Sequence, residues 1–137
     1  MKSILYKLFG AGKIRDPLLN ELKSENIIAS DEGVKTTITY KDFRAPGRYS
    51  NWKRRWIVGA IILTSKRLIL QQYSRPVINL ELTDERFKKI KISLETADTL
   101  LFEFEPQLFL ENSSGKIEWR CRTPHAKMIA DRLHLMN

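Results

Sequence analysis

The stretch Trp56-Ile-Val-Gly-Ala-Ile-Ile-Leu63 decides the fold, because it is continuously apolar and rich in β-branched residues. A run of this length and composition predicts a central strand that is covered on both faces. The short connection Thr64-Ser-Lys-Arg67 follows, and a second apolar run then covers residues 68–73. Two such runs joined by a tight polar connection predict an antiparallel hairpin.

Alternation of apolar and polar residues predicts five further strands around this hairpin. A polar loop, residues 42–53, is expected between the first two strands. Pro106 should mark a bulge or an edge of the sixth strand, because proline cannot donate to a sheet ladder. Asn112-Ser-Ser-Gly115 is expected to form a hairpin turn. The seven expected strands cover residues 34–41, 56–63, 68–73, 78–82, 90–94, 100–111 and 117–121.

Both ends of the chain carry helical patterns. Residues 124–136 repeat apolar side chains at helical spacing, with Thr123 as N-cap and a proline at the first helical position. Asp16-Pro17 predicts a short helix that Asp16 caps. A two-turn apolar stripe, residues 2–9, reads either as a membrane anchor or as a packing element. We therefore divide the chain into an N-terminal helical extension, residues 1–25, and one domain, residues 26–137.

The hairpin also carries a family resemblance. The segment from Gly59 to Leu70, GAIILTSKRLIL, resembles the hairpin of GRAM and bacterial pleckstrin-homology-like (PH-like) domains. The resemblance covers roughly residues 26–135. It implies a mainly β, α+β fold: a seven-stranded antiparallel partial barrel that a C-terminal helix caps, with short N-terminal helices. Residues 124–136 lack tryptophan, so the core there would be filled by Ile129, Leu133 or Met136.

Positive charge is concentrated in one part of the chain. The formal net charge is +8, from 24 basic and 16 acidic residues. Residues 41–75 contain nine basic residues and one acidic residue, which gives +8, so the remaining fifteen basic and fifteen acidic residues balance. Charge segregated in this way produces a directional field, which favours anionic partners.

Most of this charge lies in or beside the predicted loop 42–53. Lipid-binding PH domains place a lysine at the end of the first strand and a basic-x-basic trio at the start of the second, and the resemblance gives these roles to Lys41 and to residues 53–55. Cations from adjacent strand ends could together hold a phosphate. Tyr49 and Trp52 could contact a membrane interface or a partner, or stack on a base. The candidate ligand-binding residues are Lys41, Arg44, Arg48, Lys53, Arg54 and Arg55.

Catalytic and metal-binding patterns are missing from the sequence. Cys121 is the single cysteine, so the chain forms no internal disulfide and no cysteine-based zinc site. Alternation places Cys121 in the core, where a cysteine is usually unreactive, so we do not expect it to form a catalytic thiol–imidazole pair with His125. The two histidines, His125 and His134, fall on opposite faces of the predicted helix, and Glu103 with Glu105 reads as a solvated strand face. We therefore predict a protein that is not an enzyme and has no metal or cofactor.

Together these patterns predict a binding or adaptor module. Its basic loop would face anionic membrane headgroups or an acidic protein surface. A solvated loop that binds no ligand is a further possibility. The alternative is a self-assembling scaffold that uses strand edges or the N-terminal helix, and nucleic-acid binding ranks last. We expect no signal peptide and no transmembrane segment, hence a cytoplasmic protein or one peripheral on the inner face of the membrane.

Overall fold

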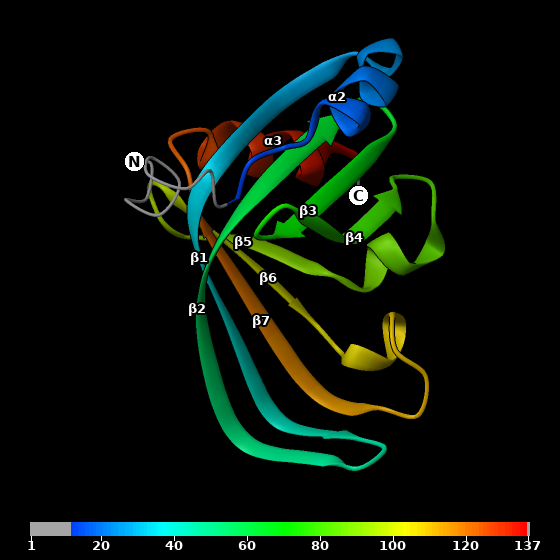
Figure 1. Ribbon diagram of the computed structural model, residues 1–137, viewed down its shortest axis with the longest axis vertical. Helices are drawn as coiled ribbons and strands as arrows, with labels where there is room; N and C mark the ends of the chain where they lie inside the picture. Colours follow the sequence, from blue (N-terminus) through cyan, green and yellow to red (C-terminus); the bar gives the residue numbers. More distant parts are fainter. Residues whose placement is uncertain (1–11, 137) are drawn as a thin grey trace.

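A computed structural model describes residues 12–136, so the apolar stripe 2–9 lies outside the described residues (Figure 1). Seven antiparallel strands form one open sheet in the order β4-β3-β2-β1-β7-β6-β5. The predictions of a mainly β chain, seven antiparallel strands and a C-terminal helix are confirmed. The strands are β1 Ile27–Ala45, β2 Arg48–Thr64, β3 Arg67–Gln72, β4 Arg75–Glu81, β5 Lys91–Thr96, β6 Thr99–Phe104 and β7 Ser114–Arg122. The helical elements are α2 Asp16–Leu22, η1 Lys23–Glu25, η2 Glu85–Lys89, η3 Pro106–Leu108 and α3 Ala126–Met136.

The long strands β1 and β2 organise the sheet, which curves around the main hydrophobic core (Figure 1). We call the side of the sheet that carries Ile38 and Trp119 the concave face, and the opposite side the convex face. Ile61 of β2 is buried in the main core, whereas the next residue, Ile62, is buried in a second cluster. The prediction that β2 is covered on both faces around these residues is therefore confirmed.

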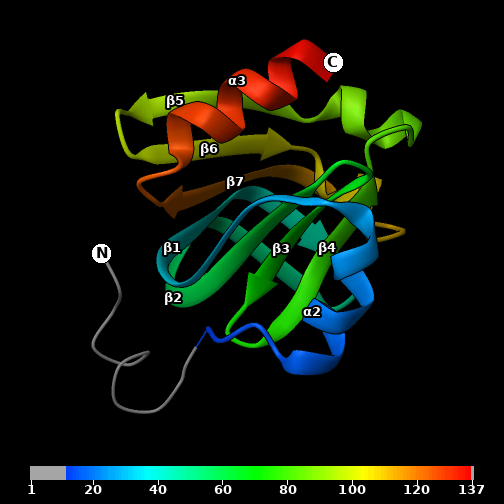
Figure 2. The ribbon, with the colours of Figure 1, turned by 90° about the horizontal axis from the view of Figure 1, so that it is seen from above.

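The C-terminal helix α3 packs on the concave side, beside β5 and β6 (Figure 2). Ile129 and Leu133 are buried in the main core, as predicted, and the Met136 side chain lies outside the described residues. The helix begins at Ala126, two residues later than predicted. Thr123 still acts as a cap, because its Oγ1 accepts a hydrogen bond from the backbone N–H of His125 at 3.2 Å.

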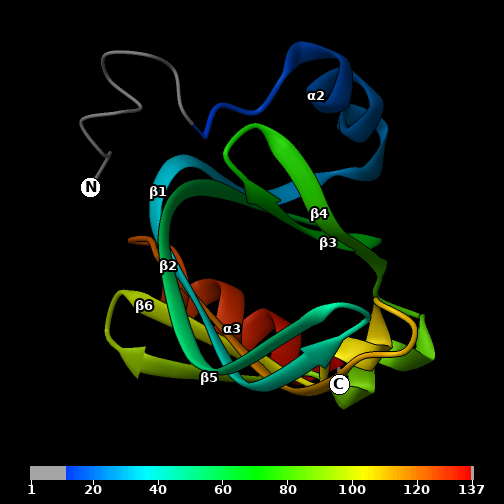
Figure 3. The same cartoon turned by 60° about the horizontal axis from the view of Figure 1, so that its bottom comes forward.

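The short helix α2 covers the other side of the sheet, away from α3, as Figures 2 and 3 show. Its residue Leu22 packs with Ile62 and Ile69 in the second cluster. Asp16 lies in the first turn, and Arg15 occupies the cap position without a side-chain hydrogen bond, so the predicted Asp16 cap is wrong. A carboxylate in the first turn still interacts favourably with the positive end of the helix dipole.

Other predicted boundaries also differ from the structure, and β1 starts at Ile27, seven residues before the predicted strand. Residues 42–53 do not form a loop: β1 runs to Ala45 and β2 starts at Arg48, and these two residues pair across the turn Pro46-Gly47. Proline followed by a glycine of positive φ suits a tight turn, and polar strand residues are tolerated where both faces meet water. The strand predicted over residues 100–111 ends at Phe104, because Pro106 starts η3. The segment 112–115 consequently leads into β7 and forms no tight hairpin.

Candidate functional site

The structure divides the predicted basic site between the two faces of the sheet. Successive strand residues point to opposite faces. Arg55 pairs with Ile38 on the concave face, whereas Arg54 pairs with Thr39 on the convex face. Lys53 is exposed opposite Tyr40. The basic trio 53–55 therefore does not converge on one phosphate as predicted.

A kink in β1 adds Arg48 to the concave face. Asp42 has a φ of +48°, and β1 shifts its register with β7 between Lys41 and Arg44. This bulge lets Phe43, beyond the kink, turn its ring toward Tyr40, with the ring centroids 5.3 Å apart. Arg48 follows the same change of direction and lines a cavity together with these two aromatic residues.

The cavity that receives these side chains lies on the concave face and has a volume of about 450 Å³. We call it the concave cavity. Arg48, Arg55 and Arg75 supply its positive charge, and its other walls are mainly apolar. No carboxylate lines it among the described side chains. The remaining lining residues are Ile38, Tyr40, Phe43, Gln72, Val77, Ile78, Phe104, Pro106, Phe109, Leu110, Ile117 and Trp119.

The three arginines of the concave cavity keep their hydrogen-bonding capacity. Within residues 12–134, none of the three guanidinium groups makes an ion pair or a side-chain hydrogen bond. By contrast, Arg67 outside the cavity binds Glu25 at 2.7 Å. Guanidinium groups in one cavity without an acidic neighbour can hold an anion, because each can donate charge-assisted hydrogen bonds to it.

Apolar side chains at the rim give the concave cavity an amphipathic character. Val77 and Leu110 line it and are 44% and 48% exposed, which is high for residues of this size. Phe109 packs edge-on against Phe104 at a centroid distance of 5.4 Å and forms part of the wall. Trp119 lines the interior, and its buried indole Nε1 has no hydrogen-bond partner among the described residues. The arrangement suits a ligand with an anionic group and an apolar part.

Lys41, predicted to bind the ligand, instead belongs to an ion-pair network on the convex face. Its Nζ lies 2.9 Å from Oε2 of Glu118, which is buried. Arg120 contacts the other oxygen of Glu118 at 3.1 Å and also binds Glu95 at 2.7 Å. Burial alone would raise the pKa of Glu118, but the hydrogen bonds from Lys41 and Arg120 outweigh it, so the pKa is lowered. This ion pair occupies the Lys41 ammonium, which makes it less available to a ligand than the arginines of the concave cavity.

Two other candidate residues, Arg44 and Arg54, lie over aromatic rings. Arg44 lies 4.6 Å from the centre of the Tyr49 ring. The Arg54 guanidinium lies 5.1 Å from the centre of the Trp52 ring, and its Nε donates to Thr39 at 2.9 Å. The two aromatic rings remain exposed, so their predicted surface position is confirmed.

Trp56 differs from its prediction as the first residue of a buried strand. It is 73% exposed on the convex face, because the cover that α2 gives to the sheet does not reach it. With Trp52, which is 55% exposed, it makes an aromatic stripe along β2 on either side of Arg54.

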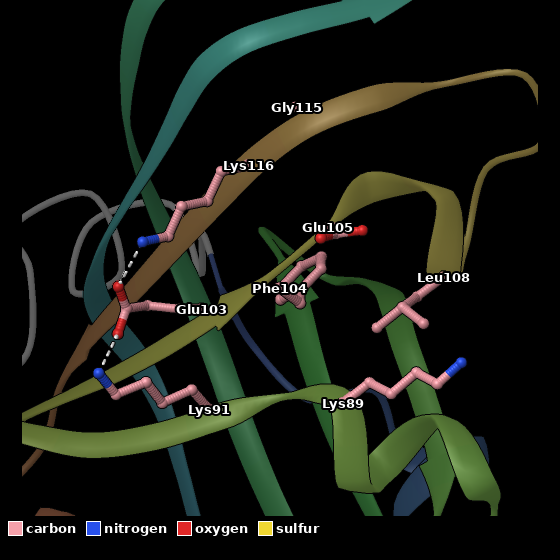
Figure 4. Close-up of a pocket in the computed structure, with 8 residues that line it drawn as sticks. All are labelled: Lys89, Lys91, Glu103, Phe104, Glu105, Leu108, Gly115 and Lys116. Atoms are coloured by element: carbon pink, nitrogen blue, oxygen red, sulfur yellow. Dashed lines mark ion pairs between the residues drawn. The ribbon is translucent and has the colours of Figure 1, made fainter.

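A second cavity, of about 420 Å³, lies beside β5, β6 and β7. In Figure 4 the ammonium groups of Lys91 and Lys116 both point toward Glu103 between them. Glu103 lies 2.9 Å from Lys116 and 3.8 Å from Lys91, and the bond to Glu103 raises the pKa of Lys116. Because these charges satisfy one another, this cavity is a weaker anion site than the concave cavity.

The residues considered for catalysis or metal binding remain apart. Cys121 is fully buried, and burial raises the pKa of its thiol to about 12, so the thiolate is rare at neutral pH. His125 and His134 are both exposed, and His134 Nε2 lies 2.7 Å from the carbonyl oxygen of Ile92. In the part of the chain that the structure describes, no group of three or more His, Cys, Asp or Glu side chains could hold a metal ion.

Arg75 is the site residue that sequence reasoning missed. It opens β4 and was counted in the basic segment, but nothing local places it opposite Arg55.

Of the helices within residues 12–136, none has the length and apolar character needed to cross a membrane. No family model matches the sequence, and no curated protein matches it. A candidate function therefore has to come from the geometry and charge of the chain itself.

Proposed function

We propose that this chain is a PH-like binding module that takes the anionic headgroup of a membrane lipid in the concave cavity. The observation that carries the proposal is the set of Arg48, Arg55 and Arg75, which line one cavity with no carboxylate beside them. Three guanidinium groups can surround a phosphate and donate several hydrogen bonds to it. No catalytic group is needed for this role.

A lipid headgroup fits better than a free inorganic anion because the cavity rim is apolar. Exposed Val77 and Leu110 would meet the glycerol backbone or the first methylenes of a lipid, where burial of apolar surface is favourable. The overall charge of +8 adds a long-range attraction to an anionic bilayer surface. Seven consecutive antiparallel strands followed by a helix also agree with the PH-like expectation.

Co-sedimentation with vesicles of graded phosphatidylserine or phosphoinositide content tests the proposal. Reversing one cavity arginine, as in Arg55→Glu or Arg75→Glu, changes the charge by two units near the surface. At about 1 kcal/mol per basic residue, we expect an affinity loss of about thirty-fold. The matched control reverses Lys66 or Lys88, which are exposed and lie outside the cavity.

Equal binding by wild type and the cavity variants would contradict the proposal. Equal losses in cavity and control variants would mean that only net charge matters, which would contradict a headgroup site as well. Competition by a water-soluble inositol phosphate should release the protein if the cavity holds the headgroup. The alternatives from the sequence, self-assembly and nucleic-acid binding, remain predictions that light scattering and the salt dependence of oligonucleotide binding can test.

A further inference from the structure

Half of β2 has an unpaired edge. β1 pairs with β2 along nearly all of its length, but β3 pairs only with residues Gly59–Leu63 of β2. The backbone N–H of Tyr73 also donates to Val58, and within residues 12–136 no strand lies on the second side of residues 48–57 (Figure 1). This edge is about 33 Å long, and every second residue along it directs its backbone N–H and C=O outward.

The two outer strands of the described sheet, β4 and β5, are better protected. β4 is short and carries Pro76 near its start, and β5 is short and packs against α3. Proline, short length and a covering helix are the usual ways in which a protein prevents another strand from pairing with an edge. The edge at residues 48–57 has none of these three features.

Charge on the β2 edge disfavours a second copy of the chain as its partner. Lys53, Arg54 and Arg55 lie in the middle of the edge, and two-fold pairing would set these cations beside their counterparts. Charged side chains on an edge strand can by themselves serve to prevent another strand from pairing with it. However, protection leaves the exposure of Trp52 and Trp56 on the same strand unexplained, because large exposed aromatic residues promote association.

We propose that the β2 edge binds an extended acidic peptide segment of another protein, which adds a strand antiparallel or parallel to residues 49–57. Main-chain hydrogen bonds would supply part of the affinity, and side chains would supply the specificity. The period of two assigns the partner's residues: its acidic side chains face Lys53 and Arg55, and its apolar side chains face Trp52 and Trp56. The peptide site shares Arg55 with the proposed headgroup site, but Arg75 lines only the cavity, and Trp52 and Trp56 lie only on the strand edge.

The test uses the full chain and a synthetic peptide of about ten residues that alternates glutamate and valine. The control peptide has the same composition with its glutamates in one block. We expect the alternating peptide to bind at least about ten-fold more tightly than the control. At saturation, hydrogen exchange should slow by about ten-fold or more at every second amide of residues 48–57, with the intervening amides, already bonded to β1, unchanged.

Variants separate this surface from the concave cavity. Trp52→Ser with Trp56→Ser should weaken peptide binding by about thirty-fold, and Lys53→Glu by about ten-fold. Arg75→Glu should leave peptide binding unchanged while it impairs vesicle binding. These residues are exposed, so the thermal unfolding midpoint of each variant should stay near that of wild type, which confirms folding.

Four results would overturn the proposal. Equal affinity for both peptides would show simple charge attraction, and protection without a period of two would exclude strand addition. If wild type does not bind the peptide and the double tryptophan variant loses vesicle binding, the aromatic stripe of Trp52 and Trp56 contacts a membrane instead. Stronger binding of a short oligothymidine, abolished by the same variant, would assign it to nucleic acid.

Discussion

Replacement of Lys41 by methionine should lower stability and spare ligand binding, although the sequence placed Lys41 in the ligand site. The Lys41 Nζ lies 2.9 Å from a carboxylate oxygen of Glu118, whose side chain is only 6% exposed. A hydrogen bond to a charged group contributes about 1.5–3 kcal/mol. The Lys41 side chain is 45% exposed and Arg120 still holds Glu118, so solvent screening reduces the expected loss to about 1–2 kcal/mol.

Urea denaturation at pH 7 and at pH 3 measures this loss. The lowered pKa of Glu118 means that the carboxylate stabilises the fold above the ordinary carboxyl range, and that this contribution disappears as the pH falls through the folded-state pKa. The difference between Lys41→Met and wild type should therefore be largest at pH 7 and narrow on acidification. The matched control is Lys53→Met, whose exposed side chain has no ion pair among the described residues, and it should change stability by less than about 0.5 kcal/mol. Equal stability of both variants at pH 7, or a gap at pH 3 as large as the gap at pH 7, would refute a structural role for Lys41.

Two other buried positions give further tests. Leu133→Ala removes a fully buried side chain of α3 and should cost about 2–5 kcal/mol in urea denaturation, whereas Met128→Ala on the exposed side of that helix should cost less than about 0.5 kcal/mol. Comparable losses would contradict the burial of Leu133. Cys121 should react with a thiol reagent only as fast as the chain unfolds, and labelling at the rate of an unfolded control would contradict its burial. Because burial raises the pKa of Cys121 to about 12, the unfolded thiol ionises first as the pH rises above 9.0; this should lower stability by up to about 1.4 kcal/mol per pH unit, a contribution that Cys121→Ala removes.

Local pattern was sufficient for most of the fold. The alternation in residues 34–41 and 117–121 correctly predicts which residues face the core, although Thr39 and Glu118 on the opposite face are also buried. The helical spacing of Ile129 and Leu133 likewise reports their burial in the core. The turn Pro46-Gly47 was overlooked, because polar residues flank it and strands exposed on both faces show no alternation.

The candidate site was predictable in part. The concentration of charge in residues 41–75 can be read directly from the sequence, and this segment contains Arg48, Arg55 and Arg75. Strict alternation along β2 also predicts that Arg54 and Arg55 face opposite sides of the sheet. It fails beyond Asp42, however, because the positive φ there changes which face Arg48 occupies. The backbone kink is a property of the packed sheet, and the sequence shows no clear signal for it.

Sequence alone therefore determined that the chain is a mainly β protein with seven antiparallel strands, a C-terminal helix and one strongly basic segment. Tertiary structure decided which cations are available to a ligand. Lys41 is held by Glu118, 77 positions away, and Arg75 reaches the cavity of Arg48 and Arg55 only because the sheet curves. The physical reason is that composition fixes the number of charges, whereas pairing and direction depend on contacts between residues that are distant in the chain.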